Sequence, residues 1–130
     1  MATEKKTIRS DAAPKALGSY AQAIVANGMV YCAGQLPIDP ATGNFVPGGI
    51  TEHTEQVLKN LRAVLKAAGS DLDRAVKTLV FIKNMSDFAA MNEVYARPEY
   101  FGPNPPARST IEVARLPRDS LIEIELVAIA

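Results

Sequence analysis

The sequence has very little cysteine and histidine, and each shortage excludes a class of protein. Its 130 residues include one cysteine, Cys32, and one histidine, His53. A lone cysteine cannot form an intramolecular disulfide bond, and this usage is typical of a reducing compartment. A lone histidine without other ligands at metal-binding spacing predicts no metal site. A Ser-His-Asp triad also has no support, because no serine is marked out as a partner for His53.

Net charge and long apolar runs are absent as well. The 14 basic and 14 acidic residues give a formal net charge of zero, whereas binding to a phosphate backbone needs clustered Lys and Arg. We therefore expect no nucleic-acid partner. No apolar run approaches the roughly 20 residues of a membrane-spanning helix. Residues 1–10 are polar, so we expect neither a membrane partner nor a secretory signal. The expected location is the cytoplasm, with a mitochondrial pool left open for a eukaryotic source.

What is present is the composition of one globular domain, which we expect to comprise residues 1–130. Hydrophobic residues make up 48% of the chain and charged residues 22%, which is ordinary for a folded, water-exposed protein. Asn27-Gly28 joins two apolar runs, 19–26 and 29–33. This dipeptide predicts a hairpin with a type I′ turn, because that turn needs a positive φ at both of its central positions.

Helical and strand periods then alternate along the chain. Apolar residues at helical spacing predict a helix that begins near Thr51, a candidate N-cap, and stops at Gly69. A second helix is expected to begin at Ser86 and to be limited by Pro98. Two-residue alternation predicts further strands at 6–9, 75–83, within 105–114 and at 121–129. In strand 75–83, one face is expected to carry Val76, Thr78, Val80 and Ile82.

This order of elements predicts an α+β fold in which two helices pack on one face of a mixed β-sheet. The other face would then leave apolar residues of strand 75–83 and of the last strand uncovered. Self-association is the simplest way for a chain of this size to cover such a face, so we expect a homo-oligomer.

Arg108 is the leading candidate for chemistry. Pro105 and Pro106 hold the chain extended just before it. A planar guanidinium at such a rigid position suits a two-pronged grip on a carboxylate. The structural alternative is an edge-strand arginine paired with a nearby glutamate, for which Glu112 is the candidate.

Two glutamates on the last strand are candidates to act with this arginine. Glu123 and Glu125 share one face of that strand, and we expect adjacent strands to bring one of them near Arg108. A carboxylate there could orient or activate a water molecule. The alternative is a pair of solvated strand glutamates with no role in chemistry.

One segment, 105–117, has the sequence PPARSTIEVARLP and is followed by IEIE at 122–125. It closely resembles the C-terminal signature of the RidA family, and the resemblance extends over nearly the whole chain, including GSY at 18–20 and CAGQLP at 32–37. It implies a chorismate-mutase-like fold and a homotrimer with sites in the clefts between subunits. It also implies a deaminase that hydrolyses 2-iminobutanoate and 2-iminopropanoate, or their enamine tautomers, to 2-keto acids and ammonia without a cofactor or metal.

The resemblance also assigns roles to residues. Arg108 would bind the substrate carboxylate, and Glu123 would position a water together with the main-chain carbonyl of Thr110.

Three further residues match positions that line the family's cleft: Tyr20, Gly34 and Asn92. Each has a structural alternative. Tyr20 could be a half-buried tyrosine with its hydroxyl at the rim, Gly34 a plain strand-end glycine, and Asn92 an exposed helix residue.

Thr110 departs from many bacterial relatives, which carry cysteine at this position. Roles that need the thiol are therefore in doubt here, whereas hydrolysis is not, because threonine keeps the backbone carbonyl. Cys32 does not replace that thiol. It lies in an apolar strand, where we expect it to pack as a small hydrophobic residue.

Two other functions remain open: an endoribonuclease that inhibits translation, and a non-catalytic ligand-binding or holdase-like module. Zero net charge and the lack of a histidine pair count against the first. Arg108 counts against the second, because members of that kind typically lose this arginine. The resemblance implies small 2-imino and 2-keto carboxylic acids as partners, of which the 2-imino acids, or their enamine tautomers, are released by pyridoxal-phosphate dehydratases.

Overall fold

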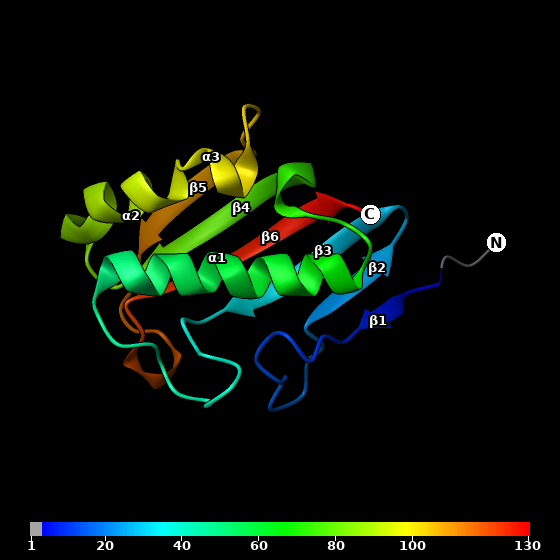
Figure 1. Cartoon of the computed structure of the whole chain (residues 1–130), viewed down its shortest axis with the longest axis horizontal. Coiled ribbons are helices and arrows are strands. Elements are labelled where there is room, and N and C mark those ends of the chain that lie inside the picture. The colour runs from blue at the N-terminus through cyan, green and yellow to red at the C-terminus, as the bar shows by residue number, and fades with distance from the viewer. Residues whose placement is uncertain (1–3) are drawn as a thin grey trace.

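A mixed β-sheet carries its helices on one face (Figure 1). The structure is a computed structural model that describes residues 4–130. These residues form six strands in the order β1-β2-β3-β6-β4-β5, in which only β4 and β5 run parallel. The strands are β1 (Lys6–Ile8), β2 (Ala23–Ala26), β3 (Met29–Gln35), β4 (Ala75–Ile82), β5 (Ala107–Glu112) and β6 (Ile122–Ile129).

The helices of the described part are α1 (Ile50–Ala67), α2 (Phe88–Tyr95) and α3 (Pro98–Phe101), with three short 3₁₀ turns, η1 (Leu72–Arg74), η2 (Met85–Asp87) and η3 (Pro117–Asp119). The predicted α+β class, the mixed sheet and the two main helices on one face are thus confirmed. The second helix ends at Tyr95, before Pro98, which occupies the first position of α3, where its missing N–H costs nothing. Contrary to the prediction, Ser86 is not the N-cap of the second helix, because it lies in η2 and Asp87 takes that position. No helix within residues 4–130 has the length and apolar character to span a membrane.

The predicted hairpin is present between β2 and β3. Asn27 and Gly28 have φ values of 51° and 73°, as a type I′ turn requires. β2 begins at Ala23, later than the predicted run. The chain before it is held in a loop by Gln22, whose side chain accepts from the N–H of Ser10 and donates to the carbonyls of Ser10 and Pro14.

The start of α1 differs from the prediction. The helix begins at Ile50, so Thr51 is not its N-cap. Gly49 occupies that position, and the Glu52 side chain accepts a hydrogen bond of 2.8 Å from its backbone N–H. The acidic side chain thus satisfies the backbone N–H of the N-cap residue, as the third helical residue of a capping box does. At the other end Gly69 follows the helix with a φ of 79°, as predicted for a stop signal.

The core lies between α1 and one face of the sheet. Residues from both layers are completely or almost completely buried, among them Val30, Val80, Ile82, Ile122 and Ile124 of the sheet and Leu58, Leu61 and Leu65 of α1. Thr78 shares this face and is also fully buried. Val76 does not share it, contrary to the prediction. A bulge between Ala75 and Lys77 turns Ala75 inward and leaves Val76 39% exposed.

No helix formed by residues 4–130 covers the opposite face of the sheet, as expected from the sequence (Figure 1). Here Tyr31, Ile111 and Ile129 are all more than 40% exposed, and they lie on β3, β5 and β6. Strand pairing places Phe81 and Val127 on the same face. We call this surface the open face. Such a run of apolar side chains is typical of a surface that contacts another chain.

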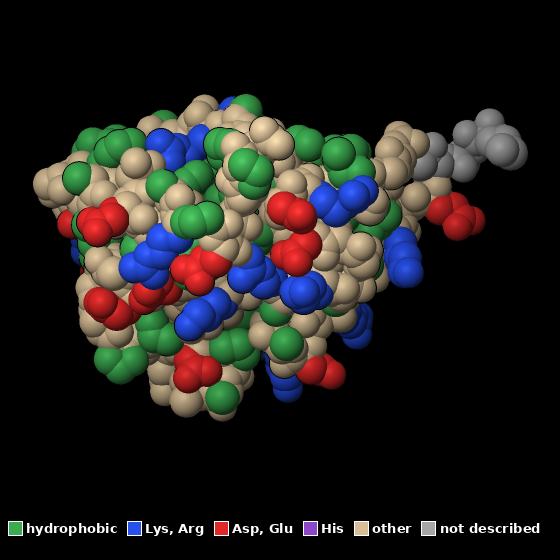
Figure 2. Space-filling model, turned by 45° about the horizontal axis from the view of Figure 1, so that its top comes forward, with side chains coloured by type: hydrophobic (Ala, Val, Ile, Leu, Met, Phe, Trp, Pro, Cys, Tyr) green, Lys and Arg blue, Asp and Glu red, His purple; other side chains and the backbone are tan. Residues whose placement is uncertain are grey.

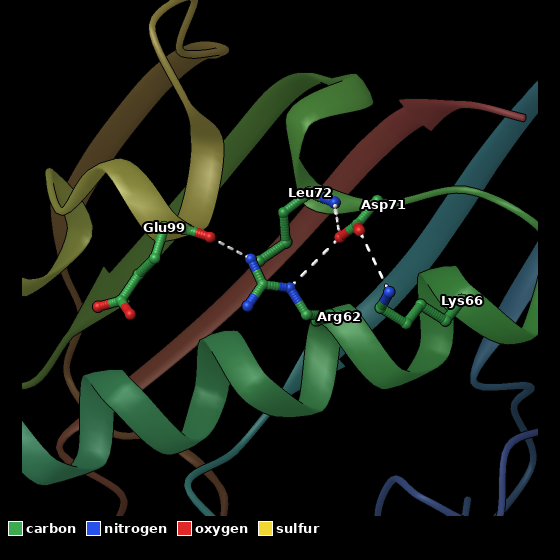
Figure 3. A network of polar contacts seen from close by, with 5 residues as sticks. All are labelled: Arg62, Lys66, Asp71, Leu72 and Glu99. Carbon is green, nitrogen blue, oxygen red and sulfur yellow. Dashed lines mark hydrogen bonds and ion pairs between the residues drawn. The ribbon is translucent and has the colours of Figure 1, made fainter.

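A polar network ties α1 to the segments that lead into the sheet (Figure 3). The guanidinium of Arg62 donates to Asp71 Oδ1 at 3.3 Å and to the carbonyl of Glu99 at the α3 end. Lys66 lies 3.4 Å from Asp71 Oδ2, and the N–H of Leu72 donates to Oδ1. Burial alone would raise the pKa of Asp71, but these donors and cations together hold it below its ordinary value. Arg62 therefore links α1 to the start of η1 and to α3 through hydrogen bonds.

We expect Arg62→Ala to lower the free energy of unfolding by about 1–2 kcal/mol, because it removes one of the donors to the partly buried Asp71 carboxylate and the side-chain donor to the Glu99 carbonyl. Urea denaturation followed by circular dichroism measures this change. Lys66→Ala, on the same exposed side of α1, is the matched control and should cost at most about 0.5 kcal/mol, since it removes one solvent-screened pair. Equal losses in the two variants would contradict the assigned role of Arg62.

Candidate active site

Arg108 lies near the start of β5, opposite Thr78 of β4 in the parallel pairing. Its side chain is therefore on the face covered by α2. There its Nη1 donates to Asn92 Oδ1 at 2.7 Å. Its guanidinium carbon lies 4.7 Å from the ring centre of Tyr95 and 5.4 Å from that of Phe88. One amide oxygen and two aromatic faces thus hold the cation in place.

No carboxylate within residues 4–130 forms an ion pair with Arg108. Glu112, the expected structural partner, instead accepts a hydrogen bond of 2.8 Å from the N–H of Met85. Arg108 therefore keeps N–H donors without a counterion. It borders a cavity of about 370 Å³, together with Asn92, Tyr95, Ala96, Arg97, Phe101, Gly102, Pro105 and Pro106. A partly buried, unpaired guanidinium of this kind suits an anionic ligand.

Glu123 lies half-buried on β6 and packs against Gly34 at the end of β3. A Cβ added at Gly34 would overlap the carboxyl end of Glu123, so glycine is the residue that lets the carboxyl lie there. Burial raises the pKa of Glu123, and the negative charge of Glu125 raises it further. The carboxyl is thus suited to take up and release a proton nearer neutral pH than an exposed glutamate.

The cavity beside Glu123 has a volume of about 470 Å³. Tyr20, which is 54% exposed, and Gly34 both line it, as the sequence predicted for a cleft. The other lining residues are Pro14, Lys15, Leu17, Ala33, Gln35, Leu36, Ile38, Pro117 and Arg118. Three of the predicted site residues therefore meet here, and Arg108 and Asn92 meet in the other cavity.

The expectation that adjacent strands bring a glutamate near Arg108 is wrong. β4 lies between β5 and β6, so the two strands are not neighbours. In the register, Arg108 pairs with Thr78 and Glu123 pairs with Phe81. Thr78 and Phe81 are three residues apart on one strand, and side chains alternate between faces. Arg108 and Glu123 of one chain consequently point to opposite faces of the sheet.

Thr110 follows Arg108 on the same face of β5. Its Oγ1 is buried and has no hydrogen-bond partner among the described residues. The hydroxyl is therefore unsatisfied within the described part of the chain, and the role expected for the Thr110 backbone carbonyl stays a prediction. Cys32 is buried, and burial raises the pKa of its thiol to about 12. It is packed as a small hydrophobic residue, as predicted, and its thiolate is suppressed.

Sequence reasoning missed one cation of the Glu123 cavity, Arg118. Its φ of 56° is unusual for a residue with a side chain. Its Nη1 donates to the carbonyl of Gly43 at 3.1 Å, and its guanidinium lies 4.8 Å from the ring centre of Phe45. Nothing in the local pattern marks this position, because the contact joins segments 75 residues apart.

His53 and the described acidic residues offer no metal centre. His53 is buried, and its Nε2 lies 2.9 Å from the carbonyl of Val46. Among residues 4–130 no group of three or more His, Cys, Asp or Glu side chains is placed to hold a metal ion.

Comparison with known proteins gives the family. Residues 10–130 match the family described as endoribonuclease L-PSP, the one that contains the RidA proteins. The chain belongs to this family. A RutC family protein of Pyrococcus horikoshii is 53% identical over 95% of this RidA-family chain and 97% of the relative. The 2-iminobutanoate/2-iminopropanoate deaminase of Rattus norvegicus is 45% identical over 96% and 90%, respectively.

Solved structures of RidA-family proteins share the fold. A protein of Thermotoga maritima described as a putative endoribonuclease superimposes with a TM-score of 0.91 at 49% identity, covering 96% of this chain and 97% of the other. TdcF of E. coli with bound serine gives the same score at 38% identity, covering 96% and 98%. The resemblance deduced from the motifs at 105–117 and 122–125 is thereby confirmed.

Gly34→Ala tests the contact between Gly34 and Glu123. The new methyl group should push the flexible Glu123 side chain toward water, so we expect the pKa of this carboxyl to fall toward its ordinary value of about 4.5. Carbon-13 chemical shifts of the glutamate carboxyls measure the titration. Gly49→Ala is the control, because a Cβ there meets nothing within 4 Å. An unchanged Glu123 titration in Gly34→Ala would rule out the contact.

Proposed function

We propose that this RidA-family chain hydrolyses 2-imino acids with small side chains, such as 2-iminobutanoate and 2-iminopropanoate, to 2-keto acids and ammonia. The observation that carries the proposal is the partly buried guanidinium of Arg108, which has no counterion among residues 4–130 and is aimed by Asn92. Relatives named as deaminases for these substrates, at 45% identity in rat and in mouse, support it.

Substrate binding follows from the chemistry of the guanidinium. Arg108 has five N–H donors and uses one on Asn92. Two of the remaining donors can hold the two oxygens of the substrate carboxylate in one plane. TdcF, a structural neighbour, is described with bound serine, a small molecule that carries such a carboxylate. We infer that the Arg108 guanidinium recognises the carboxylate of a small 2-imino acid here.

Glu123 supplies the proton transfers. Its carboxylate takes a proton from water as the water oxygen adds to the imine carbon. That proton then passes to the nitrogen, which gives the neutral carbinolamine. The carboxylate next accepts the hydroxyl proton as the C=O bond of the keto acid forms and delivers this proton to the nitrogen as the C–N bond breaks, so that NH3 leaves and the carboxylate is regenerated. A carboxyl with a raised pKa suits both directions of transfer. Holding water against an already reactive imine supplies much of the remaining rate.

The reaction needs Arg108 and Glu123 together, and one chain places them on opposite faces of its sheet. We therefore infer that each site combines the Arg108 cavity of one copy with the Glu123 cavity of another. The open face, with its exposed Tyr31, Ile111 and Ile129, is the surface on which copies would associate. A homotrimer with three shared sites is the assembly we propose.

Two alternatives have less support. Figure 2 shows basic and acidic side chains interleaved on the face it displays, without a continuous basic band for RNA. The sequence's one histidine, His53, is buried and bonded to a backbone carbonyl, which leaves it poorly placed for ribonuclease chemistry. A purely ligand-binding module remains the second candidate, because an unpaired Arg108 would also serve one.

Arg108→Ala should lower kcat/KM for imine hydrolysis by about 100-fold, since it removes the charge that holds the carboxylate. An amino-acid oxidase generates the imine, and semicarbazide traps what is not hydrolysed. We expect the wild type to reduce the trapped product and the variant to leave it nearly unchanged. Arg115→Ala is the matched control, because the Arg115 side chain is 79% exposed and only weakly paired. A wild type that leaves the trapped imine unchanged would favour the binding module.

Mixing two inactive variants tests the shared site. Arg108→Ala keeps an intact Glu123, and Glu123→Gln keeps an intact Arg108. Random mixed trimers formed by unfolding and refolding an equal mixture should regain about one quarter of the wild-type sites. Each variant refolded alone should stay inactive. If the mixture gains no activity although mixed trimers are detected by mass spectrometry, the site lies within one chain.

A further inference from the structure

Tyr95 is the largest group in contact with Arg108, and none of the sequence motifs pointed to it. The ring is 5% exposed at the end of α2. The Arg108 guanidinium carbon lies over it at 4.7 Å, closer than over the ring of Phe88. The negative face of an aromatic ring attracts a cation at this distance. The other aromatic contact of Tyr95, with Phe101 at 4.6 Å, is made with α3.

Thr78 fixes the far end of this ring. Its hydroxyl lies 2.7 Å from the hydroxyl of Tyr95, and both atoms are buried. Thr78 is also the strand partner of Arg108 in the register of β4 and β5. Beside it on the covered face of β4 lie Val80 and Ile82, so a hydroxyl here stands out. The bond compensates for burying two polar groups, and it holds the ring at one height above the sheet.

We propose that Tyr95 is a positioning residue for Arg108, and that Thr78 sets the position of Tyr95. The inference rests on the proposed role of Arg108 in binding the substrate carboxylate. Arg108 reaches its cavity on a long, flexible side chain from an edge strand. Ordering such a side chain at the moment of binding costs free energy, and a ring already beneath the cation reduces that cost.

The chemistry of the ring agrees with this role. Burial raises the pKa of Tyr95, and this effect outweighs the opposing influences of Thr78 and Arg108. The phenol therefore stays neutral at physiological pH. A neutral ring attracts the guanidinium through its face without neutralising it, whereas a carboxylate in the same place would take the N–H donors. Arg108 is thus held in place and still free to bind an anion.

Binding of 2-ketobutyrate, the product of the proposed reaction, is the readout, because it needs the carboxylate clamp but no turnover. Isothermal titration of the assembled protein measures its affinity. We expect Tyr95→Leu to weaken binding about 3- to 30-fold. Thr78→Val should weaken it about 2- to 5-fold by freeing the ring, and Thr78→Ser should restore it. Thr78 is completely buried, so an effect of Thr78→Val must pass through its neighbours.

Val94→Ala is the control for a general loss of packing. Val94 is buried on the same helix and belongs to the hydrophobic core. This variant should lose stability and keep its affinity. In an Arg108→Ala background, Tyr95→Leu should weaken binding no further, as expected for residues that act as one unit.

Three outcomes would overturn the proposal: unchanged affinity in Tyr95→Leu, an equal loss in Val94→Ala, or a full additional loss in the Arg108→Ala background. A wild type that binds 2-ketobutyrate, with Arg108→Ala impaired and the Tyr95 and Thr78 variants normal, would leave the proposed function intact and remove only this inference. A wild type that fails to bind 2-ketobutyrate would remove both.

Discussion

The position of β4 between β5 and β6 is the constraint on which the site depends. Side chains alternate along a strand, and the register of β4 with its two neighbours fixes which of their residues share a face. Arg108 is thereby placed under α2 and Glu123 on the open face. The two side chains proposed to carry the chemistry, Arg108 and Glu123, are therefore separated by the sheet. The proposed reaction, which uses both groups, is for this reason assigned to a site shared between two copies.

Both groups are left uncompensated in a single chain. Arg108 has an amide oxygen and two aromatic rings around it but no carboxylate, and Glu123 has no cation within ion-pairing distance among the described residues. Elsewhere the fold pairs its charges readily, as Arg97 does with Glu55 at 2.5 Å. Leaving two half-buried charges unpaired costs stability. That cost is understandable if a ligand and a second copy complete the site.

The same helix layer that forms the core also aims the candidate site. α2 contributes Val94 to the core, and from neighbouring positions it directs Asn92 and Tyr95 at Arg108. On the other side of the sheet, Gly34 has no side chain, and the Glu123 carboxyl therefore lies directly against its backbone. The core and the candidate site therefore share residues: Tyr95 is buried in the core and also contacts the guanidinium of Arg108.

Local periodicity and turn chemistry were enough to predict the α+β class, the Asn27-Gly28 hairpin and the sheet face without helices. The sequence also pointed to Arg108, Glu123, Tyr20, Gly34 and Asn92 through the family motif. Only the tertiary structure decided how these residues are grouped, since strand order and register are long-range properties that no local pattern records. The bulge that exposes Val76, the Thr78–Tyr95 bond and the reach of Arg118 to Gly43 likewise join residues whose contact no spacing along the chain reveals.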